Sequence, residues 1–459
     1  MSRHRTTQWI TVLACSVLGL ALVPAGQAAA ADGTEYATSF EDGQPLPDWE
    51  DSVEGDKTGG LESTMTSARG TGPAESPTAK EKVGYTGTRS AKMSGKHTVS
   101  GRGYSYNKLL DTDIEVTETS ELSYLVFPVF VEDAPANPST FVAVDLAFTD
   151  GTYLSELGAV DQHGAKLDPT SQGESETLYT DQWNRKAVPL GKVAAGKTVD
   201  RVLLAYDNPK GPAEFTDFFD DISVVGEPEA PDADSPADHV LTTRGTQASG
   251  DFSRGNNFPA TGVPHGFNFY TPVTDAGSTS WLYQYHRANN ADNRPELQAF
   301  SVSHEPSPWM GDRQTFQVMP STASKTPDAD REKRALSFGH DKEIAKPHHY
   351  GVMFDNGIST DIAPASHSGL FRFSFPDDNA NLIFDNVTGD GGLSLNKSDN
   401  TVTGYSDVKS GLSTGATRMF MYAEFDDSAV AGEKLPGGGG ENVAGYLRFD
   451  AGDDRTVQM

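Results

Sequence analysis

The segment from residue 281 to residue 312 gathers the side chains that are best suited to chemistry. It opens with Trp281-Leu282-Tyr283-Gln284-Tyr285 and, after a polar insert, ends with Phe300 to Asp312, a stretch that contains His304, Glu305 and Trp309. Flat aromatic rings pack on the apolar C–H face of a sugar, and fixed polar groups hydrogen-bond to its hydroxyls. The residue types of this segment therefore favour carbohydrate binding.

Other chemistries fit the sequence less well. His304-Glu305 does not begin a zinc-protease helix, because residue 308 is proline where the second histidine would stand, and the prolines at 306 and 308 break the helical turn. Serine, histidine and aspartate are too common in the sequence for an unplaced catalytic triad to be assigned. Cys15 is the only cysteine, so disulfides, cysteine-ligated zinc and thiol catalysis are excluded for a chain that has lost its first 31 residues.

The N-terminus predicts export. A basic stretch from Arg3 to Arg5, an apolar run of about 15 residues from Trp9 to Val23 and small residues up to Ala31 follow in the order of a secretory signal peptide. A membrane anchor is the alternative, but a span needs about 20 apolar residues. We therefore expect residues 1–31 to be cleaved, the protein to be secreted, and no membrane to be its partner after cleavage.

The composition is strongly acidic. The 459 residues include 65 acidic and 36 basic ones, a formal net charge of −29. Nucleic acid and anionic membranes require a basic surface, so neither is expected as a partner. The charge serves solubility outside the cell or, alternatively, the binding of a hard cation such as calcium, which prefers carboxylate oxygens.

Hydrophobic periodicity predicts strands almost throughout. Apolar residues alternate with their neighbours over 141–148 and over 371–375, as in half-buried strands, while Leu122 to Val131 is apolar on both faces. Glycine and proline interrupt these runs every 8–12 residues or so, which is typical of β-sandwiches. We expect an all-β fold, in which a jelly-roll β-sandwich precedes a large antiparallel β-sandwich.

The chain divides at an acidic, proline-rich linker. Glu227 to Asp238 has no aromatic and no β-branched residue, a composition that stays extended and solvated. The linker separates a first module, residues 32–226, from a second module, residues 239–459. Inside the first module, the acidic and small residues from Glu54 to Lys82 predict a long loop.

The two ends of the first module carry short motifs. They are Phe40-Glu41-Asp42-Gly43, followed by Trp49, and the closing Phe218-Phe219-Asp220-Asp221-Ile222. The pair resembles the galactose-binding-like jelly rolls used as carbohydrate-binding modules, in which the first and last strands are neighbours. The resemblance makes Glu41, Asp42 and Asp221, or Asp220 in its place, candidate ligands of a structural calcium. Ordinary acids at strand ends are the alternative. Tyr104, Tyr106 and Trp183 are candidates for stacking on a sugar, with core packing as the alternative.

The second module carries longer motifs in a fixed order. They are GNNFPATGVPHGF at 255–267, the Trp281 segment (residues 281–285), Phe300 to His304 with Gly311-Asp312, Met319-Pro320, and the stretch from Phe338 to Pro376. This order resembles the N-terminal domain of glycoside hydrolase family 92. Family members are mostly calcium-dependent, exo-acting α-mannosidases that invert configuration. The resemblance implies a β-sandwich docked on an (α/α)6 barrel, calcium as the cofactor, and α-mannosides of N-glycan or mannan type as substrates.

The same resemblance supplies the candidate sugar-binding residues. In the family, the N-terminal domain lends residues to the sugar site at its interface with the barrel, and the matching positions are Trp281, His304, Phe258, Glu305, Trp309 and Asp312. Core packing is the alternative for Trp281, and a loop histidine bonded to backbone is the alternative for His304. Residues 305–309 replace a glycine-rich stretch of the relatives, which leaves the linkage preference open.

No catalytic residue is assigned by the resemblance. The acid, the base and most calcium ligands of the family lie in the helical barrel, and the sequence ends at Met459 before it. Inversion requires two carboxyl groups roughly 6.5–9.5 Å apart. We expect the non-catalytic front of a secreted α-mannosidase, inactive by itself, whose partner is the missing barrel. The alternatives are a complete extracellular carbohydrate-binding protein and a structural or adhesion protein without sugar affinity.

Overall fold

The computed structural model describes residues 34–49, 57–134, 137–228, 236–247, 255, 257–303, 316–407, 418–436 and 443–459. Its sheets are all antiparallel, which confirms the all-β prediction. Helices are short: α1 is Pro169–Glu174, α2 is Gly191–Ala194, and three further turns are 3-10 helices, η1 Pro138–Thr140, η2 Leu154–Leu157 and η3 Pro236–His239. The expected signal peptide lies outside the described residues. Within them, no helix is long and apolar enough to cross a membrane.

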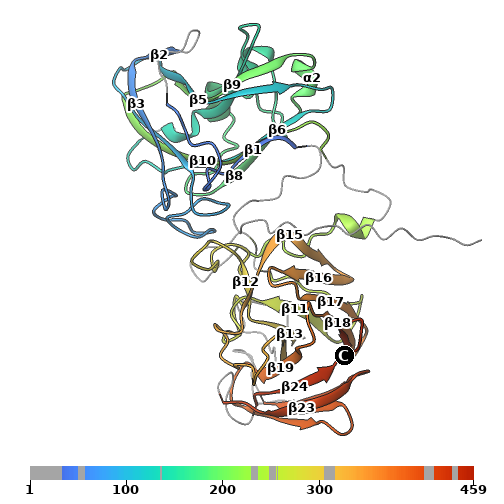
Figure 1. Cartoon of the computed structure of the whole chain (residues 1–459). Helices are drawn as coiled ribbons and strands as arrows, with labels where there is room; N and C mark the ends of the chain where they lie inside the picture. The colour runs from blue at the N-terminus through green and yellow to red at the C-terminus, as the bar shows by residue number, and fades with distance from the viewer. Residues whose placement is uncertain are drawn as a thin grey trace, which may run out of the picture.

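The first module is a sandwich of two sheets (Figure 1). One sheet has the order β3-β4-β10-β6-β8, with β1 also paired to β10, and the other has the order β2-β5-β9-β7. Side chains from both sheets, among them Leu109, Val144 and Phe219, form one hydrophobic core. The strands are β1 Thr34–Thr38, β2 Lys57–Gly59, β3 Leu61–Ser67, β4 Ala91–His97, β5 Gly103–Glu115, β6 Glu121–Pro128, β7 Val142–Phe148, β8 Asn184–Val188, β9 Thr198–Asn208 and β10 Ala213–Val225.

Two expectations for the first module are corrected. The predicted loop from Glu54 to Lys82 contains β2 and β3, and β3 pairs with β4 along its whole length. Its period-two pattern is weak because small and polar residues alternate, with Ser63 between Leu61 and Met65 on the inner face. Strand β7 is buried on both faces rather than on one, because the segment that contains η2 and α1 packs on the side away from the core.

The second module contains three sheets (Figure 1). Their orders are β11-β13-β14-β19-β24-β23, β12-β15-β16-β17-β18-β25 and β20-β21-β22. As predicted for a half-buried strand, β18 buries Phe371 and Phe373 and exposes Arg372. The strands are β11 Phe269–Val273, β12 Glu296–Leu297, β13 Ala299–Ser303, β14 Phe316–Ser321, β15 Leu336–Lys346, β16 His349–Phe354, β17 Ser359–Pro364, β18 Gly369–Ser374, β19 Ala380–Asn386, β20 Gly391–Asn396, β21 Thr401–Ser406, β22 Met419–Glu424, β23 Ser428–Lys434, β24 Gly445–Asp450 and β25 Thr456–Gln458.

The two sets of sheets are joined by loops and not by strand pairing. Among the described strands, none between β1 and β10 pairs with one between β11 and β25. The predicted linker ends in the 3-10 turn η3, and its residues 229–235 lie outside the described part of the chain. The contacts between the modules come instead from a long loop after β3 and from the connection between β11 and β12.

Candidate functional site at the module junction

The Trp281 segment lies in the connection between β11 and β12. Its turn is fixed by backbone hydrogen bonds, since the N–H groups of Thr274 and Asp275 both donate to the Leu282 carbonyl at 2.9 and 3.1 Å. Leu282 and Tyr283 are buried in the core of the second module, and Trp281 is half-buried with a left-handed φ of 49°. Tyr283 therefore lies inside the module, whereas Trp281 lies at its boundary. The left-handed backbone of Trp281 is unfavourable by itself and must be stabilised by the surrounding contacts.

A buried carboxylate lies behind this segment. Glu343 on β15 accepts hydrogen bonds from the hydroxyl of Tyr283 at 3.1 Å, from the hydroxyl of Tyr350 at 2.8 Å and from Nδ1 of His340 at 2.7 Å. The other ring nitrogen of His340 faces the Tyr285 carbonyl at 2.8 Å, and the two rings stack with centroids 3.7 Å apart. This network ties the connection between β11 and β12 to strands β15 and β16.

The donors around Glu343 determine what it can do. Burial raises the pKa of Tyr283 and of Tyr350 well above the usual range, and the charge of Glu343 adds to that effect. Both hydroxyls therefore remain protonated and donate. A carboxylate whose oxygens already accept three donors is stabilised as an acceptor and is poorly placed to protonate a leaving group. Glu343 thus positions Tyr283, Tyr285 and His340. Sequence reasoning missed it because its partners stand up to 60 positions away.

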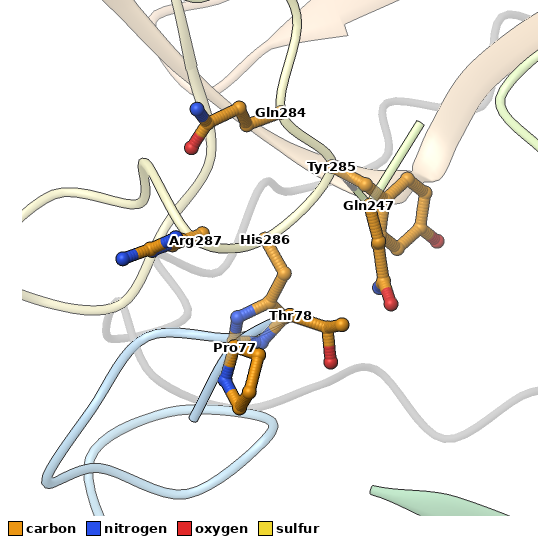
Figure 2. Close-up of a pocket in the computed structure, with 7 residues that line it drawn as sticks. All are labelled: Pro77, Thr78, Gln247, Gln284, Tyr285, His286 and Arg287. Carbon is orange, nitrogen blue, oxygen red and sulfur yellow. The ribbon is translucent and has the colours of Figure 1, made fainter. Parts of the chain in front are cut away.

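His286 connects the Trp281 segment to the first module. Its Nδ1 accepts the backbone N–H of Lys80 at 3.1 Å, and its Nε2 donates to the carbonyl of Tyr85 at 2.5 Å. Figure 2 shows its ring projecting from the connection between β11 and β12 toward Pro77 and Thr78 of the first module. The ring also stacks on Tyr85, with centroids 4.5 Å apart. Burial lowers the pKa of His286 to about 4, so the neutral tautomer that this geometry requires is the stable form at neutral pH.

Asn293 provides the second contact between the modules. Its side-chain amide donates to the carbonyls of Gly84, Tyr85 and Gly87 at 3.0, 3.1 and 2.6 Å. Asn289 donates to both oxygens of Asn293 and so orients that amide. The side-chain amide of Asn293 and the ring of His286, both in the second module, therefore donate hydrogen bonds to a run of backbone carbonyls in the first module.

The acids that were candidates for calcium hold this run of carbonyls in place. Glu41 accepts the N–H groups of Thr88 and Arg89, both at 2.7 Å, and Asp220 accepts those of Tyr85 and Thr86 at 2.7 and 3.1 Å. The loop approaches closely because residues 84 and 87 are glycines: a Cβ there would lie 2.6 Å from an Asp220 oxygen and 2.4 Å from the Glu41 carboxyl carbon.

The predicted calcium trio is not assembled as a metal site. Asp42 is exposed and pairs with the Arg89 guanidinium at 2.5 Å, while Asp221 accepts the Thr86 hydroxyl at 2.8 Å. Burial raises the pKa of Asp221 to about 6. Over the described part of the chain, no three metal-ligating side chains are grouped so that they could share an ion. Glu41 accepts backbone N–H groups, whereas Asp42 and Asp221 accept side-chain donors, and a short sequence motif does not distinguish these roles from metal ligation.

The remaining candidate residues are distributed as follows. Phe258 is 1% exposed and packs on Phe269, so its role in this structure is core packing. Trp183 packs edge-on against Phe127 and Tyr85, Tyr104 lies under the Arg102 guanidinium, and Tyr106 is buried beside Asp207. Four candidates lie outside the described residues: His304, Glu305, Trp309 and Asp312.

The crevice at the junction is closed. It is lined by residues of both modules, namely Pro77, Thr78, Gln247, Gln284, Tyr285, His286 and Arg287 (Figure 2). None of its space is wide enough for a water molecule. The junction therefore fixes the connection that carries Trp281, and this crevice, as far as the described residues form it, is too narrow for a sugar.

The match to a family model concerns the second module. Residues 239–459 match the family model described as Glycosyl hydrolase family 92 N-terminal domain. A family GH92 inverting mannosidase from Bacteroides thetaiotaomicron VPI-5482 is similar over 48% of this chain and 30% of its own, with 28% identity and a TM-score of 0.42. A family GH92 α-mannosidase from Bacteroides thetaiotaomicron is similar over 48% and 32%, with 25% identity and a TM-score of 0.39.

A second structure of that α-mannosidase, in complex with mannoimidazole, is similar over 44% of this chain and 30% of its own, with 24% identity and a TM-score of 0.37. The chain thus spans about a third of the length of these mannosidases. No curated protein sequence matches it.

Proposed function

We propose, from the premise that residues 239–459 are a glycosyl hydrolase family 92 N-terminal domain, that this chain is the sugar-binding front of a secreted, exo-acting α-mannosidase. The observation that carries the proposal is the match of the family model over the whole second module. The substrates would be α-mannosides of N-glycan or mannan type. Export rests on the N-terminal sequence, in which basic, apolar and small residues follow in order.

In this proposal the second module supplies binding and not the acid and base. Inverting hydrolysis needs one carboxylic acid at the leaving oxygen and one carboxylate that activates water, roughly 6.5–9.5 Å apart. The buried carboxylate bonded to Tyr283, Glu343, is occupied by two tyrosine hydroxyls and a histidine. We therefore assign it a supporting role behind Trp281 and assign no catalytic residue to this chain.

Calcium dependence belongs to the proposed whole enzyme. The carboxylates Glu41, Asp42 and Asp221 do not fit a calcium ion in the arrangement described above, because Asp42 turns to Arg89. We derive no catalytic step of this chain from the metal. A requirement for calcium in the whole enzyme would be met by other ligands.

The test is hydrolysis of α-mannobiosides by the complete gene product, with and without EDTA. We expect release of mannose that EDTA abolishes, and no release by residues 32–459 alone. Trp281→Ala in the active protein should lower kcat/KM by about tenfold, since it removes an aromatic surface next to the sugar. Phe420→Ala, an exposed aromatic residue on β22, is the matched control. A complete gene product without activity on any α-mannoside would contradict the proposal.

A further inference from the structure

A cavity of about 400 Å³ opens in the first module and shares no lining residue with the junction crevice. It lies on the face of the β2-β5-β9-β7 sheet that is opposite to the core residues Leu204 and Tyr206, beneath the segment that contains η2 and α1. Its lining residues are Arg102, Tyr106, Tyr153, Ser155, Glu156, Asp168, Thr170, Asp207 and Pro209. The volume is within the range of small-molecule sites, which are roughly 300–1,000 Å³.

The floor of the cavity is an ion pair whose carboxylate, Asp207, is buried. Asp207 at the end of β9 is 3% exposed, and it accepts Nε of Arg102 at 2.7 Å as well as a second, short bond from the Arg102 Nη2. The Tyr106 hydroxyl donates to the same carboxylate at 3.0 Å. The Arg102 guanidinium lies over the Tyr104 ring, 4.7 Å from its centroid, and more than half of the Arg102 side chain is exposed. A bidentate pair of this kind fixes the orientation of both groups.

The walls are also fixed by hydrogen bonds before any ligand binds. Asp145, buried on β7, accepts the Ser155 backbone N–H at 3.0 Å and the Ser155 hydroxyl at 2.6 Å, which anchors the turn that carries Glu156. The Thr170 hydroxyl donates to the Asp207 carbonyl at 2.9 Å. Asp168 caps α1 by accepting the Ser171 N–H at 2.9 Å. The cavity is therefore a preformed site, as binding clefts usually are.

The lining selects a class of ligand. Three carboxylates, Glu156, Asp168 and Asp207, stand against one guanidinium, so the local charge is negative and repels phosphates, sulfates and uronic acids. Carboxylates accept strong hydrogen bonds from hydroxyl groups, and Ser155 and Thr170 contribute further hydroxyls. The rings of Tyr106 and Tyr153 supply flat apolar surface for a C–H face. The combination of acceptors, one cationic donor and aromatic surface suits a neutral polyhydroxylated ring.

We propose that this cavity binds a neutral sugar residue of an extracellular glycan, independently of the mannosidase function proposed for the second module. Tyr153 contacts the ring face, and Glu156 at the exposed rim together with Asp168 accepts its hydroxyls. Arg102, held by Asp207, donates to a ring or hydroxyl oxygen. The first module then holds the protein on its glycan substrate, which raises the local concentration of chain ends for any catalytic module attached to it.

The proposal is tested by calorimetry on the full chain titrated with the methyl glycosides of mannose, galactose and glucose, and with glucuronate and inorganic phosphate as anionic probes. We expect at least one neutral glycoside to bind with a millimolar or tighter Kd, and neither anion to bind. Glu156→Ala and Tyr153→Ala should each weaken that Kd by about tenfold, since each removes one ligand contact. Glu118→Ala, an exposed acid in the same module, is the matched control and should leave the Kd unchanged.

Three results would overturn the proposal: no neutral glycoside binds, an anion binds more tightly than the glycosides, or the two cavity variants bind like the parent chain. Glu156 is exposed, so its variant tests the site even where Tyr153→Ala fails to fold, and thermal unfolding of each variant shows which case applies. The binding heat that the cavity variants lose comes from the first module and does not require hydrolysis. Loss of mannosidase activity in the complete gene product would therefore leave this result unaffected, and the reverse also holds.

Discussion

Acidification should open the junction between the modules, and His286 should be the group responsible. The ring is 3% exposed, and both nitrogens are engaged with Lys80 and Tyr85 in a way that only the neutral tautomer allows. Protonation would place a hydrogen on Nδ1 against the Lys80 N–H. The nearby Lys80 ammonium opposes protonation further. The docked state therefore excludes a proton that the undocked histidine binds readily.

The magnitude follows from the pKa. Burial lowers the pKa of His286 to about 4 when docked, whereas an exposed histidine titrates near 6.5. Because the docked state binds fewer protons, docking is fully favourable above about pH 6.5 and weakens as the pH falls toward 4. At about 1.4 kcal/mol for each pH unit, this window corresponds to a loss of about 3 kcal/mol of docking free energy. Below pH 4 both states are protonated and the loss is complete.

Neighbouring buried acids give a pH dependence of stability that is opposite in sign to that of His286. The assay must therefore separate the two contributions. Burial raises the pKa of Asp221 to about 6 and also raises the pKa of Asp220 well above its usual range. Their contribution to stability is present at low pH and is lost as the pH rises through those values. A variant without the histidine keeps this acidic contribution. The difference between the parent chain and His286→Gln therefore isolates the histidine.

The assay uses a pair of fluorophores, one on each module. With Cys15 replaced by serine the chain has no cysteine, so Lys210→Cys and Ser368→Cys, both exposed positions, can be labelled without interference. The urea concentration at which energy transfer falls should decrease as the pH is lowered from 7.5 to 4.5. In His286→Gln the urea midpoint should decrease less with falling pH than in the parent chain. In the control His348→Gln, at an exposed histidine, it should decrease as much as in the parent chain. Equal pH slopes for His286→Gln and the parent chain would refute the mechanism.

Three further predictions concern buried ionisable groups. Asp161→Ala should destabilise the first module by about 3–5 kcal/mol in thermal unfolding, because Lys186, paired with it at 2.8 Å, is left buried without its counter-ion. Asp217→Asn should stabilise the same module at pH 7. Burial raises the pKa of Asp217 well above its usual range, so the parent chain loses stability as the pH rises and the carboxyl group ionises. The stability gained by the asparagine variant should therefore vanish toward pH 4, where the carboxyl group is neutral. Glu343→Gln should destabilise the second module by about 1–3 kcal/mol, because an amide N–H₂ then replaces either the oxygen that accepts from Tyr283 and Tyr350 or the oxygen bonded to Nδ1 of His340. An undiminished melting temperature would contradict the network.

Local sequence patterns predicted the class of fold but not which strands are covered on their outer faces. The alternation over residues 141–148 correctly indicated a strand, and its inward residues Val142, Val144 and Leu146 lie in the core. The outer face of β7 is buried as well, since Asp145 holds the turn at Ser155 against it. The residue pattern of a strand does not show whether a segment later in the chain will cover its outer face. The predicted loop that became β3 failed for a related reason, because its inner positions include serine.

The candidate site was predicted in part, for reasons that depend on distance along the chain. The Trp281 segment was recognisable because its aromatic residues are contiguous, and the structure places it beside the junction. Glu343, His286 and Asn293 gave no comparable indication. Each has at least one partner between 60 and 209 positions away, so only the folded chain brings all of the groups together.

The acids of the first module explain how its interior reaches the candidate sugar-binding segment. Glu41 and Asp220 accept the backbone N–H groups of the loop after β3, which turns the carbonyls of Gly84, Tyr85 and Gly87 outward. Those carbonyls accept Asn293 and His286, and His286 follows Trp281 by five residues. A strongly acidic chain needs donors for its buried carboxylates. Here backbone amides supply them, so the same charges that suggested a calcium ion from the sequence instead order the surface on which the second module docks.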